Sequence, residues 1–230
     1  MKRIFAIFLF PLLLISCIGT AKFNRIVFQK FSGLPKINEQ NTNNFILIQT
    51  DKLDNLDDLL VKSEKLKSFF IPAILYWGWN NTIKCELNPL SVASRFNSSL
   101  VSYANSIDLQ RTLNGQRLEI SIESIPNSFI YFLKGGLLLI RNFGVLSNYE
   151  DIVPEKQELR FSYKLITRTN EIKTGTITID CNDQPVINTW GPTRKFIGEY
   201  INIYNGDLTS LSKDAVDNIL TDITSEKASE

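Results

Sequence analysis

The sequence contains no histidine among its 230 residues. Histidine is the usual general base of hydrolases that use a serine or cysteine nucleophile, and it is a common metal ligand. Its absence therefore excludes Ser-His-Asp and Cys-His catalytic pairs and histidine metal sites. The three cysteines, Cys17, Cys85 and Cys181, therefore have no histidine partner in the sequence.

An excess of charge of either sign is also lacking. Lysine and arginine total 25 and aspartate and glutamate total 24, so the chain offers no broad attraction for a phosphate backbone and nucleic acid is not expected as a partner. There is no glycine-rich phosphate loop. The acidic residues are scattered, and the adjacent Asp57 and Asp58 would bind a cation only weakly. We expect no cofactor, no metal site and no catalytic activity.

No hydrophobic run reaches the roughly 20 residues that a membrane-spanning helix needs. The run over 4–15 follows Met1-Lys2-Arg3 and has the length and the basic flank of an export signal. The second run, over 69–79, is typical of a buried strand, which we expect to continue to Leu87.

The first run ends in Leu14-Ile15-Ser16-Cys17, which resembles the lipobox of bacterial lipoproteins. The resemblance implies that residues 1–16 are a signal peptide cleaved between Ser16 and Cys17, and that Cys17 carries a diacylglycerol and often a further acyl chain. Two or three acyl chains on one residue anchor a protein stably to a membrane. No Asp and no acidic run follow Cys17. By the same resemblance, the protein faces the periplasm from the outer membrane, or lies on the cell surface in a host without one.

The rest of the chain is expected to form one domain over 23–224, joined to the lipid by a short tether over 17–22 and followed by a polar tail over 225–230. The first strand is expected over 23–29. The extended length of the tether would keep the domain within about 20 Å of the bilayer.

The order of the expected elements predicts the fold class. After a second strand over 45–49, residues 51–67 fit either a short helix or a polar loop. A helix follows over 89–107, capped by Asn88, and then a strand over 117–123. Two hairpins come next, over 129–143 with its turn at Lys134-Gly135-Gly136 and over 159–180 with its turn at Thr169-Asn170. Two C-terminal helices meet at Asn205-Gly206. Grouped rather than alternating elements predict an α+β fold: an antiparallel or mixed sheet with helices packed on one face.

Cys85 and Cys181 each lie at an expected strand. In an oxidising compartment they could form a disulfide, which would stabilise the fold by about 4–5 kcal/mol. Two separate buried thiols are the alternative, and the sequence leaves both open.

Three tryptophans are the candidate contact residues. Trp77 and Trp79 lie two apart and so share one face of a strand, and Trp190 lies in a loop. They could form a stacking platform for sugar rings or a contact for a partner, or they could simply pack in the core.

Three hypotheses for function follow. The first is a non-catalytic, lipid-anchored accessory or binding protein for envelope transport or assembly. In element order alone, the domain loosely resembles small lipoproteins of that kind. The second is a surface lipoprotein that binds glycans through the three tryptophans. The third is a hydrolase that acts through two facing carboxylates.

Overall fold

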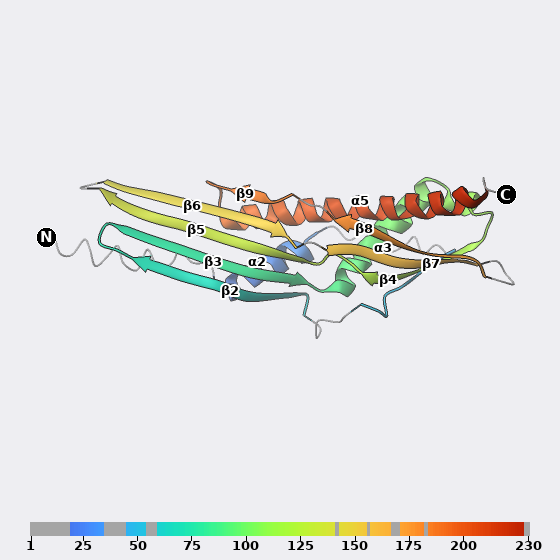
Figure 1. The fold of residues 1–230 in the computed structure, drawn as a ribbon, viewed down its shortest axis with the longest axis horizontal. Coiled ribbons are helices and arrows are strands. Elements are labelled where there is room, and N and C mark those ends of the chain that lie inside the picture. The colour runs from blue at the N-terminus through green and yellow to red at the C-terminus, as the bar shows by residue number, and fades with distance from the viewer. Residues whose placement is uncertain are drawn as a thin grey trace.

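The protein is elongated, with its strands running along the long axis and one helix beside them (Figure 1). The computed structural model describes residues 19–34, 45–53, 59–140, 143–155, 157–166, 171–181 and 184–227. The expected signal peptide, the lipobox-like residues, Asp57-Asp58 and the expected turn at Thr169-Asn170 lie outside these ranges, as does the second half of the expected polar tail.

Two long hairpins form most of a five-stranded sheet with the order β2-β3-β5-β6-β9. The first hairpin joins β2 (Val61–Pro72) to β3 (Tyr76–Leu87). The second joins β5 (Ser128–Ile140) to β6 (Phe143–Pro154), and the short β9 (Val186–Asn188) pairs with β6 at the edge. All four long strands pair antiparallel, so both hairpins point the same way and end at the same end of the molecule (Figure 1).

A four-stranded sheet with the order β1-β4-β7-β8 forms the other half of the molecule. It contains β1 (Ile46–Gln49), β4 (Arg117–Ser124), β7 (Gln157–Ile166) and β8 (Glu171–Cys181). β1 and β4 pair in parallel and the other pairs are antiparallel, so this sheet is mixed. The chain passes between the two sheets after β4 and again after β6. There the Gln157 side chain accepts hydrogen bonds from the backbone of Asn127 and Ser128.

Helices cover the inner face of both sheets. They are α2 (Thr20–Ser32), α3 (Pro89–Ser106), the short α4 (Leu109–Thr112) and the long α5 (Thr193–Lys227). The rings of Phe23 in α2 and Tyr200 in α5 both contact Phe129 of β5. α5 also contacts β8 and β9, so it bridges the two sheets (Figure 1). The α+β fold, with an antiparallel and a mixed sheet, is confirmed.

The strand expected over 23–29 is wrong, because this segment lies in the helix α2. Its buried residues Phe23, Ile26, Val27 and Phe31 recur at helical spacing and form one apolar face against the five-stranded sheet. The helix begins at Thr20, so the expected tether over 17–22 is shortened by its last three residues.

The single buried strand expected over 69–87 is also wrong. The chain turns back at Ala73–Leu75, where the Ala73 amide donates a hydrogen bond to the Tyr76 carbonyl. The segment before that turn is β2, which includes residues 61–67, where a helix or loop is expected from the sequence. The apolar run over 69–79 is therefore the end of a hairpin and is largely exposed rather than buried.

Two expected chain breaks are absent. Lys134-Gly135-Gly136 lies inside the continuous strand β5, and the hairpin turn follows Ile140 instead. Asn205-Gly206 lies inside α5, which replaces the two expected C-terminal helices and extends into the expected tail. In contrast, β1, α3 with its Asn88 cap, β4, and the hairpin of β7 and β8 are confirmed.

Candidate functional site at the hairpin ends

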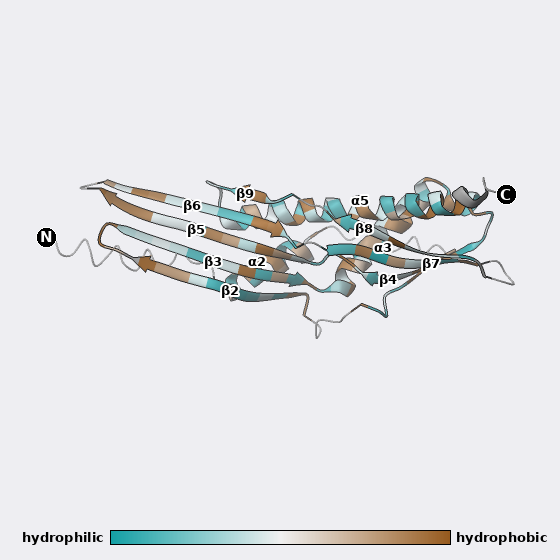
Figure 2. Cartoon of the chain, viewed as in Figure 1, coloured by the Kyte–Doolittle hydropathy of each residue, from teal (hydrophilic) through white to brown (hydrophobic). Residues whose placement is uncertain are grey.

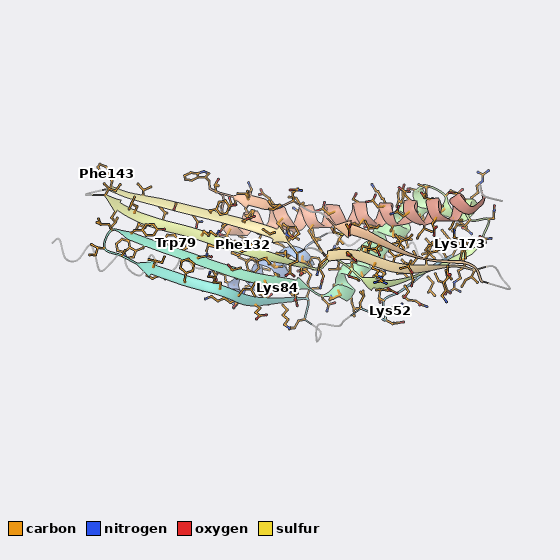
Figure 3. All side chains as sticks on the ribbon, in the orientation of Figure 1. Lys52, Trp79, Lys84, Phe132, Phe143 and Lys173 are labelled. Carbon is orange, nitrogen blue, oxygen red and sulfur yellow. The ribbon has the colours of Figure 1, made fainter. Side chains whose placement is uncertain are left out.

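The outermost parts of the two long hairpins form an apolar surface at one end of the molecule. We call this surface the hairpin ends and define it as Phe69–Gly78, Gly136–Ile140 and Phe143–Leu146. Figure 2 shows hydrophobic residues gathered there, and Figure 3 places Phe143 at its limit. It is the candidate functional site because soluble proteins rarely leave a contiguous apolar surface of this kind uncovered.

The strand register brings the two hairpins together. Tyr76 pairs with Leu138, and Ile140 pairs with Phe143. The Leu139 amide donates a hydrogen bond of 2.7 Å to the Leu75 carbonyl. The two turns are thus held side by side by backbone bonds, so their side chains form one surface.

Many large apolar side chains in this surface are exposed to solvent. Ile74 is 92% exposed and Phe143 is 77% exposed. The exposed side chains lie on both sides of the sheet. Phe70 pairs with Trp79, which faces the core, and paired residues point to the same side of a sheet. Its neighbours Phe69 and Ile71 therefore point to the other side. The remaining exposed large apolar residues of the hairpin ends are Leu75, Tyr76, Leu138, Ile140, Val145 and Leu146.

Charge is absent from the described part of the hairpin ends and begins at one level of the sheet. No charged residue occurs in the sequence between Lys67 and Lys84, and Arg141, which lies outside the described residues, is the one between Lys134 and Glu150. Lys134 pairs with Asn80 and Tyr149, and Glu150 pairs with Leu133 on the next rung. From Lys134 to Ile140 the strand spans about 20 Å, so a cap of that height, with no charge among its described residues, lies beyond this boundary.

Helix α5 begins near the same boundary. Glu150 is buried, and its carboxylate accepts hydrogen bonds from the hydroxyl of Tyr131 at 3.0 Å, from the amide of Asn188 at 2.6 Å and from the hydroxyl of Thr193. Thr193 is the first residue of α5. This cluster fixes the start of the helix to the middle of β5 and β6, which leaves the hairpin ends projecting past it.

The three tryptophans do not form one platform. Trp79 is 7% exposed, and its indole lies where a Cβ on Gly135 would stand. Trp77 is half-buried beside it, whereas Trp190 is 94% exposed in the segment between β9 and α5. β5 and β6 separate the strand that carries Trp77 and Trp79 from β9. A flat sugar-binding surface made from all three indoles is therefore absent.

No disulfide joins Cys85 to Cys181. Of the two possibilities that the sequence leaves open, the structure has the separate thiols: Cys85 pairs with Phe129 in the five-stranded sheet, and Cys181 pairs with Gln157 in the other sheet. Burial raises the pKa of the Cys85 thiol to about 12, so it stays protonated and unreactive at neutral pH.

A cavity of about 270 Å³ lies where the two sheets meet, lined in part by Glu86 of β3 and Glu123 of β4. Both carboxylates have cationic partners: Lys84 lies 3.0 Å from Glu86, and Lys52 lies 2.6 Å from Glu123. The hydrogen bond from Lys52 lowers the pKa of Glu123 below its usual value. A glycosidase uses two carboxyl groups that face each other across the substrate, whereas here each carboxylate contacts a lysine, so the arrangement does not favour that chemistry.

Within the described ranges, no three His, Cys, Asp or Glu side chains gather closely enough to hold a metal ion. No helix in this part of the chain is long and apolar enough to cross a membrane.

No family model, curated protein or solved structure matches this chain. Its function must therefore be argued from its own residues.

Sequence reasoning missed the hairpin ends as a site, although one signal was available. The run over 69–79 and the run over 137–140 are both apolar and free of charge. On its own, the first run predicts a buried strand and the second predicts the strand that follows a turn, because an apolar run predicts burial in most proteins. The pairing that places both runs at one exposed end depends on contacts far apart in the sequence.

Proposed function

We propose that this protein is a lipid-anchored, non-catalytic accessory or binding protein of the cell envelope, which engages the envelope through the hairpin ends. The observation that carries the proposal is the cap of exposed apolar side chains at one end of the five-stranded sheet, whose described residues include no charged one. The lipobox-like sequence before residue 18 supplies the anchor, and the described residues offer no arrangement of groups that favours catalysis.

The first test concerns the anchor. Mass spectrometry of the protein purified from membranes is expected to show a mature chain that begins at Cys17 and carries a diacylglycerol. Cys17→Ser should abolish incorporation of labelled fatty acid and should weaken retention of the protein in the membrane fraction. Cys181→Ser is the matched control, since it removes a thiol elsewhere in the chain and should leave the protein in that fraction. A free thiol at position 17 in the mature protein would overturn the proposal.

The second test concerns the role. Affinity capture from chemically cross-linked envelopes should recover a transporter or an assembly machine with the wild-type protein, and recovery should fall with Cys17→Ser. Capture of glycan alone would instead support the glycan-binding hypothesis through Trp190, the fully exposed indole.

A further inference from the structure

We propose that the hairpin ends bind lipid by inserting into the same membrane leaflet that holds the acyl chains of Cys17. This inference rests on the proposed lipid anchor and names the partner of the exposed surface. It would give the protein two points of attachment to the bilayer, one covalent and one made by side chains.

The chemistry of the surface favours lipid over a protein partner. A protein that docks on a sheet covers one of its faces and leaves the other in water, so one polar face is expected. Here Phe70 and Leu146 are exposed on one side, and Phe69, Ile71 and Val145 are exposed on the other. A surface that is apolar on both sides suits a medium that surrounds it, as a bilayer does.

The length of the chain before α2 sets how far Cys17 can lie from the sheet. The ring of Phe23 lies 4.8 Å from the ring of Tyr131, so this point of α2 is fixed to the middle of β5. Residues 20–23 are helical, and only three further residue steps lead back to Cys17. Even fully extended, Cys17 reaches about 15 Å from Phe23.

The hairpin ends extend farther than that reach. β5 continues for nine residues from Tyr131 to Ile140, which corresponds to about 30 Å. In the opposite direction α5 has 35 residues and spans about 50 Å. A bilayer at Cys17 therefore cannot lie beyond either end of the molecule. The domain must lean against the membrane, and the projecting hairpin ends then enter its surface.

The side chains near the turns of the two hairpins are suited to shallow insertion into the membrane. The amphipathic rings of Tyr76 and Trp77 prefer the level of the lipid headgroups, and the apolar ring of Phe143 suits the boundary between headgroups and acyl chains. The sequence carries a single charge, Arg141, between Ile140 and Phe143, and a charge is costly in the hydrocarbon centre. Insertion to about 5–10 Å, as for interfacial helices, accommodates both features.

The test uses the lipidated full-length protein in vesicles of phosphatidylethanolamine and phosphatidylglycerol. An environment-sensitive fluorophore is attached at Ile74→Cys or Phe143→Cys. Ile187→Cys on β9 is the matched control, because Ile187 is an exposed isoleucine outside the hairpin ends, and Lys195→Cys on α5 is a second. All four carry Cys181→Ser, while Cys85 stays unreactive in the core.

The fluorophores at positions 74 and 143 should shift their emission to shorter wavelength on addition of vesicles. Lipids with a nitroxide near the headgroup should quench them more strongly than lipids with a nitroxide at the end of the acyl chain. The fluorophores at positions 187 and 195 should show neither effect. Because Ile74 and Phe143 are exposed, these substitutions should leave the circular dichroism spectrum unchanged.

Two results would overturn the inference while leaving the anchor intact. The first is a protein with a confirmed diacylglycerol on Cys17 that floats with vesicles but keeps water-like emission at positions 74 and 143. The second is a shift that lipid nitroxides do not quench and that grows with protein concentration, which would assign the surface to a second copy of the chain. Absence of the lipid anchor would be detected separately, by mass spectrometry that shows no diacylglycerol on Cys17.

Discussion

At the scale of single residues, glycines and aromatic rings determine how the hairpin sheet packs. The indole of Trp79 occupies the space beside Gly135, its cross-strand partner, on the inner side of the sheet. On the other side the ring of Tyr76 lies over Gly136 and Gly78, where a Cβ would come within 2.8–2.9 Å of its hydroxyl. Gly135 and Gly136 are therefore compatible with a continuous strand, because the missing side chain of each leaves room for a large ring from the neighbouring strand.

Gly135→Ala is expected to lower the free energy of unfolding by about 1–3 kcal/mol, since the new methyl group would overlap the buried Trp79 ring. Gly206→Ala is the control within the same chain. Gly206 lies on the exposed face of α5 with open space around it, so alanine should raise that free energy by about 0.5–1 kcal/mol. Urea unfolding followed by circular dichroism measures both. Equal changes for the two variants would mean that the packing of Trp79 on Gly135 does not contribute.

At the scale of elements, the sequence predicted those whose burial pattern is complete within their own residues. In β4, Leu118, Ile120 and Ile122 alternate with polar residues, and α3 carries both a cap and an apolar face. The elements that were missed depend on distant contacts. Gly135-Gly136 looks like a turn until Trp79 and Tyr76 are placed against it.

Helix α5 shows the same limit. Asn205-Gly206 is a common helix stop, but the apolar stripe continues across it from Tyr204 to Leu208 and Ala215, all buried. Packing of this stripe against α3 and the sheets outweighs the weak local preference to end the helix.

The contact that begins α5 can be tested through Glu150. Glu150→Leu removes the acceptor for three donors, from Tyr131, Asn188 and Thr193, and leaves the buried Tyr131 hydroxyl without this partner. Unfolding free energy should fall by about 2–4 kcal/mol. Glu150→Gln keeps one acceptor oxygen and should cost less. Thermal unfolding orders the two variants, and a leucine variant as stable as the wild type would contradict the structural role of this cluster.

At the scale of the whole molecule, burial falls along the long axis towards the hairpin ends. Phe129 and Tyr131 are fully buried under α2 and α5, whereas Leu138 and Ile140 on the same strand are exposed. The sequence could show that this end is apolar and uncharged, but not that it is uncovered. That property depends on where the helices stop, which is set by the long-range contacts of Phe23 and Thr193.

Amide hydrogen exchange should follow this gradient. Without lipid, amides over 137–140 are expected to exchange faster than those over 129–133, because strand hydrogen bonds with little covering structure open more readily. Vesicles should slow exchange over 137–140 and leave residues 159–165 of β7 unchanged. Equal slowing in both segments would indicate a general effect of crowding or aggregation rather than contact at the hairpin ends.

The uninterrupted α5 has a mechanical consequence. In the proposed membrane-bound arrangement, a helix of 35 residues that touches strands of both sheets would make the molecule a stiff lever with its pivot at the membrane. A lean of about 10° at that pivot would displace the far end of the helix by roughly 9 Å, given its length of about 50 Å. Small changes in how the bilayer holds the apolar end would thus be magnified at the C-terminal end, far out in the aqueous space.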